Sequence, residues 1–217
     1  MPAKAGPGQA VYDASCTRCD RLAGFLTEVG RKYPAYFCKP VPPFGDAKPK
    51  LLIVGLAPGM HGANASGRPF TGDHAGILLY QTLHAFGFAT AAESLHAKDD
   101  LRLVGCRISN AVKCLPPQNK PTPAEIRTCN PYLKAEIAAL PADAVILALG
   151  SIAHNAVLMA CDLKAGAAKF VHGAIHELPN GRWLFDSYHC SRYNTNTRRL
   201  TEATFHSVFE AIRRHLA

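Results

Sequence analysis

A glycine-rich segment, residues 55–76, holds the side chains best suited to chemistry in this chain. It contains six glycines, two prolines, two histidines, one arginine, one phenylalanine and a single carboxylate, Asp73. Glycines let a backbone approach a ligand closely and adopt positive φ angles. An apolar run precedes the segment and a helical pattern follows it. We therefore predict a long strand-to-helix connection, a kind of loop that is usually functional or disordered.

Eight cysteines form the second group of candidate ligands. Cys16 and Cys19 make a CxxC pair, and Cys114 and Cys129 make a wider pair with fourteen residues between them. Four thiolates can hold either a tetrahedral zinc or a 4Fe-4S cluster, and this spacing alone does not choose between them. Cys38 is the main rival for the ligand set, and a site without metal is a third interpretation.

Composition and charge narrow the class of protein. No apolar run reaches the about 20 residues that span a bilayer, and the N-terminus lacks a signal-peptide pattern. We therefore predict a cytoplasmic, nucleoid-associated protein, in which reduced thiols favour metal or cluster ligation over disulfides. The chain has 24 Lys and Arg against 16 acidic residues, a formal charge of +8, which favours nucleic acid as a partner. Solubility alone is the alternative explanation.

Apolar runs alternate with helical patterns along the chain. Strands are predicted at residues 51–56, 103–112, 144–149 and 183–188, and helices at 18–32, 75–86, 123–140, 151–159 and 201–215. The first fifteen residues are predicted to be a loose leader. Strands separated by helices imply an α/β fold with a mostly parallel sheet covered on both faces. Three segments that follow strands are predicted to converge on one cleft, namely 55–76, 110–114 and 189–199.

Three separated stretches resemble one enzyme family. Residues 55–73, GLAPGMHGANASGRPFTGD, are similar to the first motif of the family 5, or B-type, uracil-DNA glycosylases. Residues 189–201, HCSRYNTNTRRLT, here named the C-terminal motif, resemble the final motif of that family, HPSxxNxxTGRLT. The CxxC pair with Cys114 and Cys129 is similar to the cluster ligands shared by families 4 and 5. The resemblance runs from Cys16 to Leu200 in the order of the family.

The resemblance implies a single α/β/α domain over residues 1–217 with a short, mostly parallel central sheet. It also implies a 4Fe-4S cluster held by Cys16, Cys19, Cys114 and Cys129. The implied activity is hydrolysis of the N-glycosidic bond of uracil and other deaminated or damaged bases in DNA, with hypoxanthine and some adducts included. The expected partner is double-stranded DNA, with single-stranded DNA left open, and the expected state is a monomer. A strict family 4-type uracil enzyme and a non-catalytic iron–sulfur protein that binds lesions are the alternatives.

The chain departs from the family pattern at several positions. Cys190 replaces the usual proline after His189, and Arg198 replaces the usual glycine before Arg199. The loop that meets DNA is therefore expected to differ in shape. Ala57 stands where family 4 enzymes carry a polar residue that activates water, which favours the B type.

A base inside a duplex must be rotated into a pocket before its bond to the sugar can be cut. Phe70 is predicted to stack on the base, and His189 to donate a hydrogen bond to a base oxygen. Asn110 is predicted to read the base edge, and Asp73 to handle water and stabilise a cationic sugar. Structural alternatives are a hydrophobic anchor for Phe70, a turn amide for Asn110 and a helix N-cap for Asp73. Further predicted pocket residues are Gly55, Ala57, His61 and Asn64, the last two as runners-up for placing water.

Basic and aromatic residues are predicted to bind DNA. Arginine neutralises phosphate, and an inserted side chain can fill the gap that a flipped base leaves. A solvated basic loop is the alternative. The predicted DNA-contacting residues are Arg68, Arg192, Tyr193, Asn194, Arg198 and Arg199, with Lys113 and Lys120 as further candidates beside the cluster.

Overall fold

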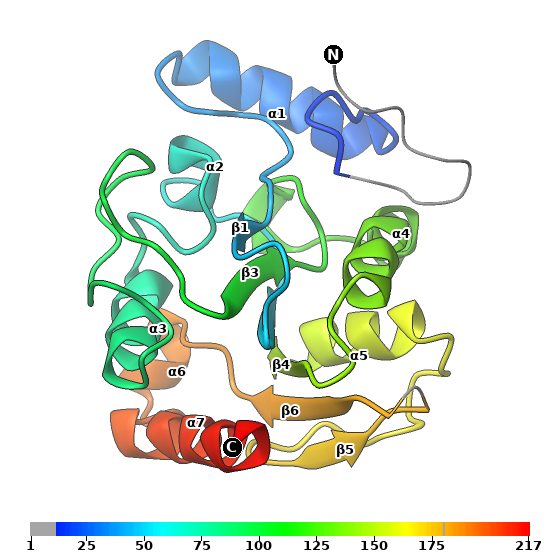
Figure 1. Ribbon diagram of the computed structural model, residues 1–217. Helices are drawn as coiled ribbons and strands as arrows, with labels where there is room; N and C mark the ends of the chain where they lie inside the picture. The colour runs from blue at the N-terminus through cyan, green and yellow to red at the C-terminus, as the bar shows by residue number, and fades with distance from the viewer. Residues whose placement is uncertain (1–11, 180) are drawn as a thin grey trace.

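A sheet of six strands forms the centre of the computed structural model, which describes residues 12–179 and 181–217 (Figure 1). The strands are β1 (Phe44–Gly45), β2 (Leu51–Gly55), β3 (Cys106–Asn110), β4 (Val145–Leu149), β5 (Ile175–Glu177) and β6 (Trp183–Ser187). Their order is β1-β3-β2-β4-β6-β5. The four inner strands run parallel, whereas β1 and β5 pair antiparallel at the two edges.

Helices cover both faces of the sheet, so the fold has three layers (Figure 1). The helices are α1 (Asp20–Lys32), α2 (Ala63–Ser66), α3 (His74–Ala85), α4 (Pro123–Ala138), α5 (Ser151–Ala160), α6 (Arg192–Asn196) and α7 (Glu202–Leu216), with a 3-10 turn η1 (Pro117–Asn119). One apolar core lies between the sheet and α3 with α7, and another lies between the sheet and α4 with α5. The predicted α/β fold with a mostly parallel sheet is confirmed.

The alternation along β2 explains why both faces of the sheet are apolar. Successive side chains of a strand point to opposite faces. Leu51 and Ile53 belong to the core under α3 and α7, whereas Leu52 and Val54 belong to the core under α4 and α5. All four are fully buried, and each such burial stabilises the fold by roughly 1.5–3 kcal/mol. Because both faces of β2 are packed, the position of its carboxyl end within the sheet is fixed.

The predicted elements are present, with ends displaced by up to three residues. The capping box predicted for α4 is also present, because Thr122 Oγ1 accepts a hydrogen bond from Glu125 N while Glu125 Oε2 accepts one from Thr122 N. The elements β1, β5, α2 and α6 were not predicted, since two to five residues are too few to show a period. In the described part of the chain, no helix is long and apolar enough to cross a membrane.

Strand register places the predicted segments at one edge of the sheet. Gly55 pairs with Asn110 at the ends of β2 and β3, and Leu149 pairs with Ser187 at the ends of β4 and β6. His189 follows β6 by two residues. Because the carboxyl ends of parallel strands share an edge, the glycine-rich segment, Asn110 and the C-terminal motif begin there together.

The N-terminal helix α1 lies outside the two packed faces of the sheet (Figure 1). Leu22 and Leu26 of α1 are buried in a third, smaller core that includes Tyr132 of α4. Most of the predicted leader lies outside the described residues. In its described part, residues 12–15, the Tyr12 hydroxyl donates to the Pro40 carbonyl oxygen. Tyr12 is therefore tied to the fold, residues 13–15 are exposed, and the loose leader stays a prediction.

Candidate functional site

A cleft of about 660 Å³ opens at the carboxyl ends of the central strands. Its walls come from the glycine-rich segment, from residues that follow β2 and β3, and from the start of the C-terminal motif. Asp73, Asn110 and His189 all line it. Ligands of open α/β sheets usually bind at this edge, so the cleft is the candidate site.

Phe70 and His189 form one wall of the cleft. Their rings are stacked, with centroids 5.7 Å apart and an interplanar angle of 29°. A Cβ atom at Gly55 would lie 2.9 Å from the Phe70 ring and closer still to Asn110 Oδ1. Only glycine at position 55 therefore lets Phe70 and Asn110 approach each other this closely. Gly55 shapes the pocket by the absence of a side chain.

His189 is a neutral imidazole in this site. Burial lowers the pKa of His189 to about 4, because a poorly hydrated environment disfavours the charged ring. The Asn194 amide donates to the His189 carbonyl oxygen at 2.8 Å and fixes the backbone there. A neutral imidazole has one N–H donor and one acceptor nitrogen, so His189 can donate one hydrogen bond to a bound molecule.

Asp73 caps α3 and also lines the cleft. Its Oδ1 accepts a hydrogen bond from Gly76 N at 2.9 Å and caps α3. Its Oδ2 faces Gly62, where a Cβ would lie only 2.5 Å away. Burial raises the pKa of Asp73, although hydrogen bonds from the Gly76 and Ala75 backbone and the nearby His74 act in the opposite direction. The N-cap interpretation and the catalytic interpretation are compatible, because the cap uses Oδ1.

Asn110 presents an unpaired polar atom at the cleft. The residue is 3% exposed, and its Oδ1 has no hydrogen-bond partner within the described ranges. Leaving a buried acceptor unpaired costs roughly 1–3 kcal/mol. A ligand donor would relieve this cost. Ala57 also lines the cleft but offers no polar side-chain atom, so Asp73 is the carboxylate among the lining residues.

His61 lines the cleft, whereas Asn64 is fully buried outside its lining. The Tyr36 hydroxyl lies 2.9 Å from His61 Nδ1 and orients the ring. Asn64 Nδ2 donates to Cys38 Sγ at 3.5 Å. The predicted role of Asn64 in placing water does not fit this position. Its amide instead contacts the segment that precedes β1.

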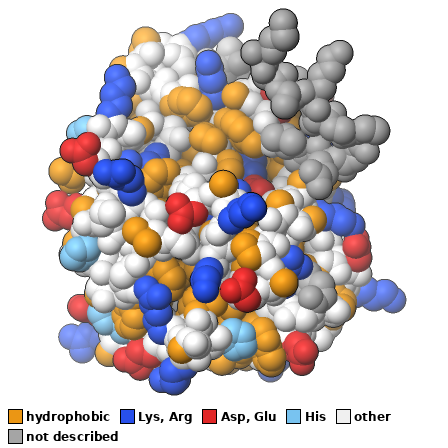
Figure 2. Space-filling view, viewed as in Figure 1, with side chains coloured by type: hydrophobic (Ala, Val, Ile, Leu, Met, Phe, Trp, Pro, Cys, Tyr) orange, Lys and Arg blue, Asp and Glu red, His pale blue; other side chains and the backbone are white. Residues whose placement is uncertain are grey.

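The predicted DNA-contacting residues of the C-terminal motif lie on α6 and on the turn after it. Tyr193 is 71% exposed, and the exposed Arg192 lines the cleft. Asn194 turns inward to His189, so it supports the loop. Arg198 and Arg199 are exposed on the turn that follows α6. Figure 2 shows Lys and Arg interspersed with acidic side chains on the face in view, so surface charge alone does not outline a DNA-binding face there.

Arg68 and Lys113 do not fit the phosphate contacts predicted for them. Arg68 is 4% exposed and its guanidinium lies 2.7 Å from Asp99 Oδ2, which lowers the pKa of Asp99 to about 2. Lys113 is 2% exposed and its Nζ lies 2.6 Å from Glu136 Oε1. Breaking a buried ion pair costs about 3–5 kcal/mol. Both cations therefore serve the fold.

The four cysteines of the predicted cluster lie together beside α1. One small cavity is lined by all four, namely Cys16, Cys19, Cys114 and Cys129, and Cys38 is not part of that lining. Burial raises the pKa of Cys114 to about 12, and the other three thiols add to this shift, which shows how close they are. Thiolates gathered in this way repel one another, so the donor set suits a cationic metal centre.

The four thiols line one cavity without forming a tight group of three ligand atoms. Within the described residues, only His154, His176 and Asp186 form a triad of potential ligand atoms within 4.8 Å of one another. Zinc with bonds of about 2.3 Å holds its sulfur ligands about 3.8 Å apart. Among the described residues, no three of the four thiols lie within 4.8 Å of one another, and this spacing alone does not choose between zinc and a cluster. Cys129 Sγ also accepts a hydrogen bond from Lys113 N at 3.3 Å, a contact of the kind that tunes cluster ligands.

Comparison with known proteins agrees with this geometry. The family model of the Uracil DNA glycosylase superfamily matches residues 42–213. This chain belongs to the uracil DNA glycosylase superfamily. The type-5 uracil-DNA glycosylase of Thermus thermophilus is 47% identical over 205 residues, which cover 92% of this chain and 93% of the relative. The type-5 enzyme of Mycobacterium tuberculosis is 42% identical over 207 residues, 89% of this chain and 75% of the relative.

Within the uracil DNA glycosylase superfamily, the chain is more similar to type-5 than to type-4 proteins. The type-4 uracil-DNA glycosylase of Archaeoglobus fulgidus is 32% identical over 170 residues, which cover 78% of this chain and 70% of the relative. The type-5 identities are higher and extend over more of the chain. The predicted family 5 resemblance is confirmed.

Sequence reasoning missed Asn119, which lines the cleft of this superfamily member. Asn119 and the preceding Gln118 both have φ of 56°. Two consecutive non-glycine residues in the left-handed region are uncommon, and such residues concentrate at functional sites. The prolines around them, in PPQNKP, indicate an irregular loop. The sequence does not show that this loop reaches the cleft.

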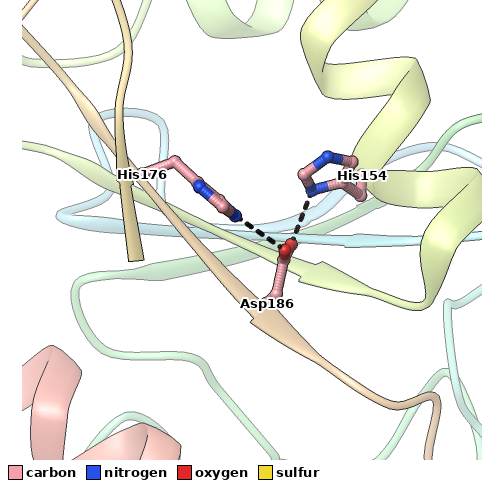
Figure 3. A group of neighbouring side chains, drawn as sticks. All are labelled: His154, His176 and Asp186. Atoms are coloured by element: carbon pink, nitrogen blue, oxygen red, sulfur yellow. Dashed lines mark hydrogen bonds and ion pairs between the residues drawn. The ribbon is translucent and has the colours of Figure 1, made fainter. Parts of the chain in front are cut away.

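A second group of titratable side chains lies outside the cleft (Figure 3). The buried carboxylate of Asp186 on β6 accepts hydrogen bonds from His154 Nδ1 at 2.8 Å and from His176 Nε2 at 3.0 Å. His154 Nε2 lies 3.0 Å from the Ala168 carbonyl oxygen. Both nitrogens of His154 face oxygen atoms, an arrangement that favours the protonated ring and raises the pKa of His154. The hydrogen bonds of Asp186 join α5, β5 and β6 of this glycosylase fold.

Proposed function

We propose that this protein is a monofunctional DNA repair glycosylase. It hydrolyses the N-glycosidic bond of uracil and of other deaminated or damaged bases, hypoxanthine and some adducts included. The observation that carries the proposal is that Asp73, Asn110 and His189 surround one cleft of about 660 Å³. The type-5 relatives are named uracil-DNA glycosylases, and a cleft of this size admits one base with its sugar.

The cleft holds the base by stacking and by hydrogen bonding. The base must first leave the duplex. Phe70 offers an aromatic face, and stacking of a base on such a ring contributes roughly 1–3 kcal/mol. Asn110 Oδ1 accepts a hydrogen bond from an N–H group of the base, which supplies the partner that this buried oxygen lacks in the protein.

Bond cleavage sends the electron pair of the C1′–N bond to the base. Neutral His189 donates a hydrogen bond to the base oxygen on which negative charge develops, a contribution of about 10²–10³ in rate for one such donor. Ionised Asp73 stabilises the cationic sugar and takes a proton from the water whose oxygen bonds to C1′. The departing base anion is then protonated, and an abasic site remains. One carboxylate is enough because the base leaves as a stabilised anion.

Double-stranded DNA is the proposed partner of a monomeric enzyme. Exposed Tyr193, which follows the cleft-lining Arg192, fills the space that the flipped base leaves. Arg192, Arg198 and Arg199 neutralise phosphates on either side of the lesion. Single-stranded DNA can enter the same cleft, because a base in a single strand has no pairing to an opposite strand that must be broken.

The four gathered cysteines would hold a 4Fe-4S cluster with a structural role. Their donor chemistry and their shared cavity support this proposal. Aerobically purified protein should be brown, absorb broadly near ~400 nm and contain about four irons. Cys114→Ser should lose the iron, and Cys38→Ser, the matched control, should keep it. A colourless protein with one zinc would overturn the assignment.

Excision assays on a panel of duplexes test the proposed activity. The wild-type protein should release uracil and hypoxanthine and leave intact abasic strands. Asp73→Asn should lose release while its affinity for the same duplex changes little. Release of uracil alone would favour a strict family 4-type enzyme, and binding of lesions without release would favour a non-catalytic protein.

A further inference from the structure

One hydrogen bond connects the glycine-rich segment to the C-terminal motif. His74 Nε2 lies 3.0 Å from Thr195 Oγ1. His74 is the first residue of α3, follows Asp73 directly and lines the cleft. Thr195 lies on α6, two residues after Tyr193. Both side chains are half-buried, so the bond is partly shielded from water.

The direction of this hydrogen bond is defined by the surroundings of Thr195. Its hydroxyl also lies 3.3 Å from the Ser191 carbonyl oxygen and 3.2 Å from the Arg192 carbonyl oxygen. A hydroxyl has one hydrogen to donate, and these carbonyls can only accept it. Thr195 therefore accepts from His74, whose Nε2 carries hydrogen.

The helix that receives this bond needs external support. With only five residues, α6 is too short to be stable by itself. At its N-terminal end, the Ser191 cap and the bond from Asn194 to His189 hold it to its own motif. Over the described ranges, His74 provides the only side-chain hydrogen bond from α3 or the glycine-rich segment to α6.

We propose that His74 is a positioning residue that holds α6 so that Arg192 stays at the cleft and exposed Tyr193 stays next to it. This inference rests on the proposed glycosylase function. A side chain that is already in place loses little entropy when it enters the DNA. Without His74, Asp73 and His189 keep their places while α6 moves more freely. The excision rate on a duplex, in which the flipped base leaves a gap, then falls more than the excision rate on a single strand.

The test is the ratio of single-turnover excision rates for uracil in a duplex and in a single strand. His74→Ala and Thr195→Val should each lower this ratio by roughly three- to tenfold, the effect of one lost hydrogen bond. The double variant should fall no further, since both changes remove the same bond. His74→Gln, which keeps an N–H donor, and Thr195→Ser, which keeps the hydroxyl, should preserve most of the ratio.

Two results would overturn the positioning role. One is an equal loss on both substrates, and the other is a double variant whose loss is the product of the two single losses. A second measurement does not need excision: 2-aminopurine fluorescence beside an abasic-site analogue reports whether the gap is filled. His74→Ala should change that signal in the same direction as Tyr193→Ala. If wild-type protein excised uracil from neither substrate, the proposed function would fall, and the fluorescence would still decide the role of His74.

Discussion

At the scale of single residues, burial shifts two residues of the cleft toward their neutral forms. It raises the pKa of Asp73 and lowers the pKa of His189 to about 4. For His189 the shift is useful, because a neutral ring donates a hydrogen bond without adding a buried charge. For Asp73 the shift means that the carboxylate forms at a higher pH than usual and is a stronger base once formed.

The excision rate should therefore rise with pH as Asp73 ionises, and then level off. The rise should be centred above about pH 3.9, the ordinary value for aspartate. His189 should add no second change above about pH 5, because its pKa is about 4. Single-turnover rates between about pH 4.5 and about pH 9 measure this profile. Asp73→Asn should abolish the rise and lower the plateau by about a hundredfold or more. An unchanged profile would remove Asp73 from the water-handling role.

Arg198 is strained by its backbone conformation. It has φ of 56° at the position where the family motif usually has glycine, and the left-handed region costs an L-residue roughly 1–2 kcal/mol. Arg198→Gly should keep or raise the free energy of unfolding, by up to about 1 kcal/mol, in urea titrations. If Arg198 contacts phosphate, the slope of log affinity against log salt should flatten by about 0.9. If Arg198→Gly had the salt slope and the free energy of unfolding of the wild type, neither backbone strain nor a phosphate contact at Arg198 would be supported.

At the scale of elements, the edge strand β5 is bound to β6 by strand pairing and also by a side-chain hydrogen bond to the buried Asp186. This strand has three residues, and its central His176 contacts the carboxylate that also binds His154 of α5. Burial disfavours the cation at His154, but the hydrogen bonds to Asp186 and to the Ala168 carbonyl outweigh it and raise the pKa of His154. Protonation of His154 and folding are therefore linked.

The stability that the protonated form of His154 contributes should fade as pH rises above 6.5. The pKa in the folded state lies above the ordinary value of 6.5. The contribution is therefore fully present below that value and is lost as pH rises through the raised pKa. Thermal melting across this range should show Tm falling as pH rises. Asp186→Asn removes the counter-charge, so it should cost about 3–5 kcal/mol and flatten this dependence. A variant with the same pH dependence as wild type would contradict the linkage.

At the scale of the whole molecule, α1 is a helix that packs in its own small core and not in the two main cores. Apart from its small core, α1 is joined to α4 by the ion pair of Arg21 with Glu125, at 2.7 Å. The Arg21 side chain of this pair is largely exposed, whereas Glu125 is buried. The proposed cluster would therefore be a further connection between α1 and the rest of the fold, beside the small core.

Loss of the cluster should release α1 before the sheet unfolds. In Cys129→Ser, amides of α1 should exchange with solvent faster, while those of β2 and β4 should stay protected, because local openings follow the weakest contacts. Hydrogen exchange measured by mass spectrometry tests this. Cys161→Ser, a change at a cysteine outside the proposed ligands, should leave α1 protected. Equal protection of α1 in both variants would contradict a structural role for the cluster.

The sequence by itself determined the main elements and the segments that meet at the cleft. Hydrophobic periodicity is a local property, and parallel strands necessarily share one carboxyl edge. Asp73 and His189 lie within the motifs that resemble the family, and Asn110 is distinguished by its place near a strand end. The short edge strands β1 and β5 have too few residues to show a period, so only the sheet revealed them.

Only the tertiary structure decided which polar side chains face the cleft and which serve the fold. Arg68 is paired with Asp99, 31 residues away, and Asn119 reaches the cleft from a loop after β3. His74 finds its partner 121 residues along the chain. The residue type of an Arg or Lys does not predict whether its side chain will contact water, a phosphate or a buried carboxylate. The partner is set by chain packing over long sequence distances, and this packing separated the residues available to DNA from those held inside.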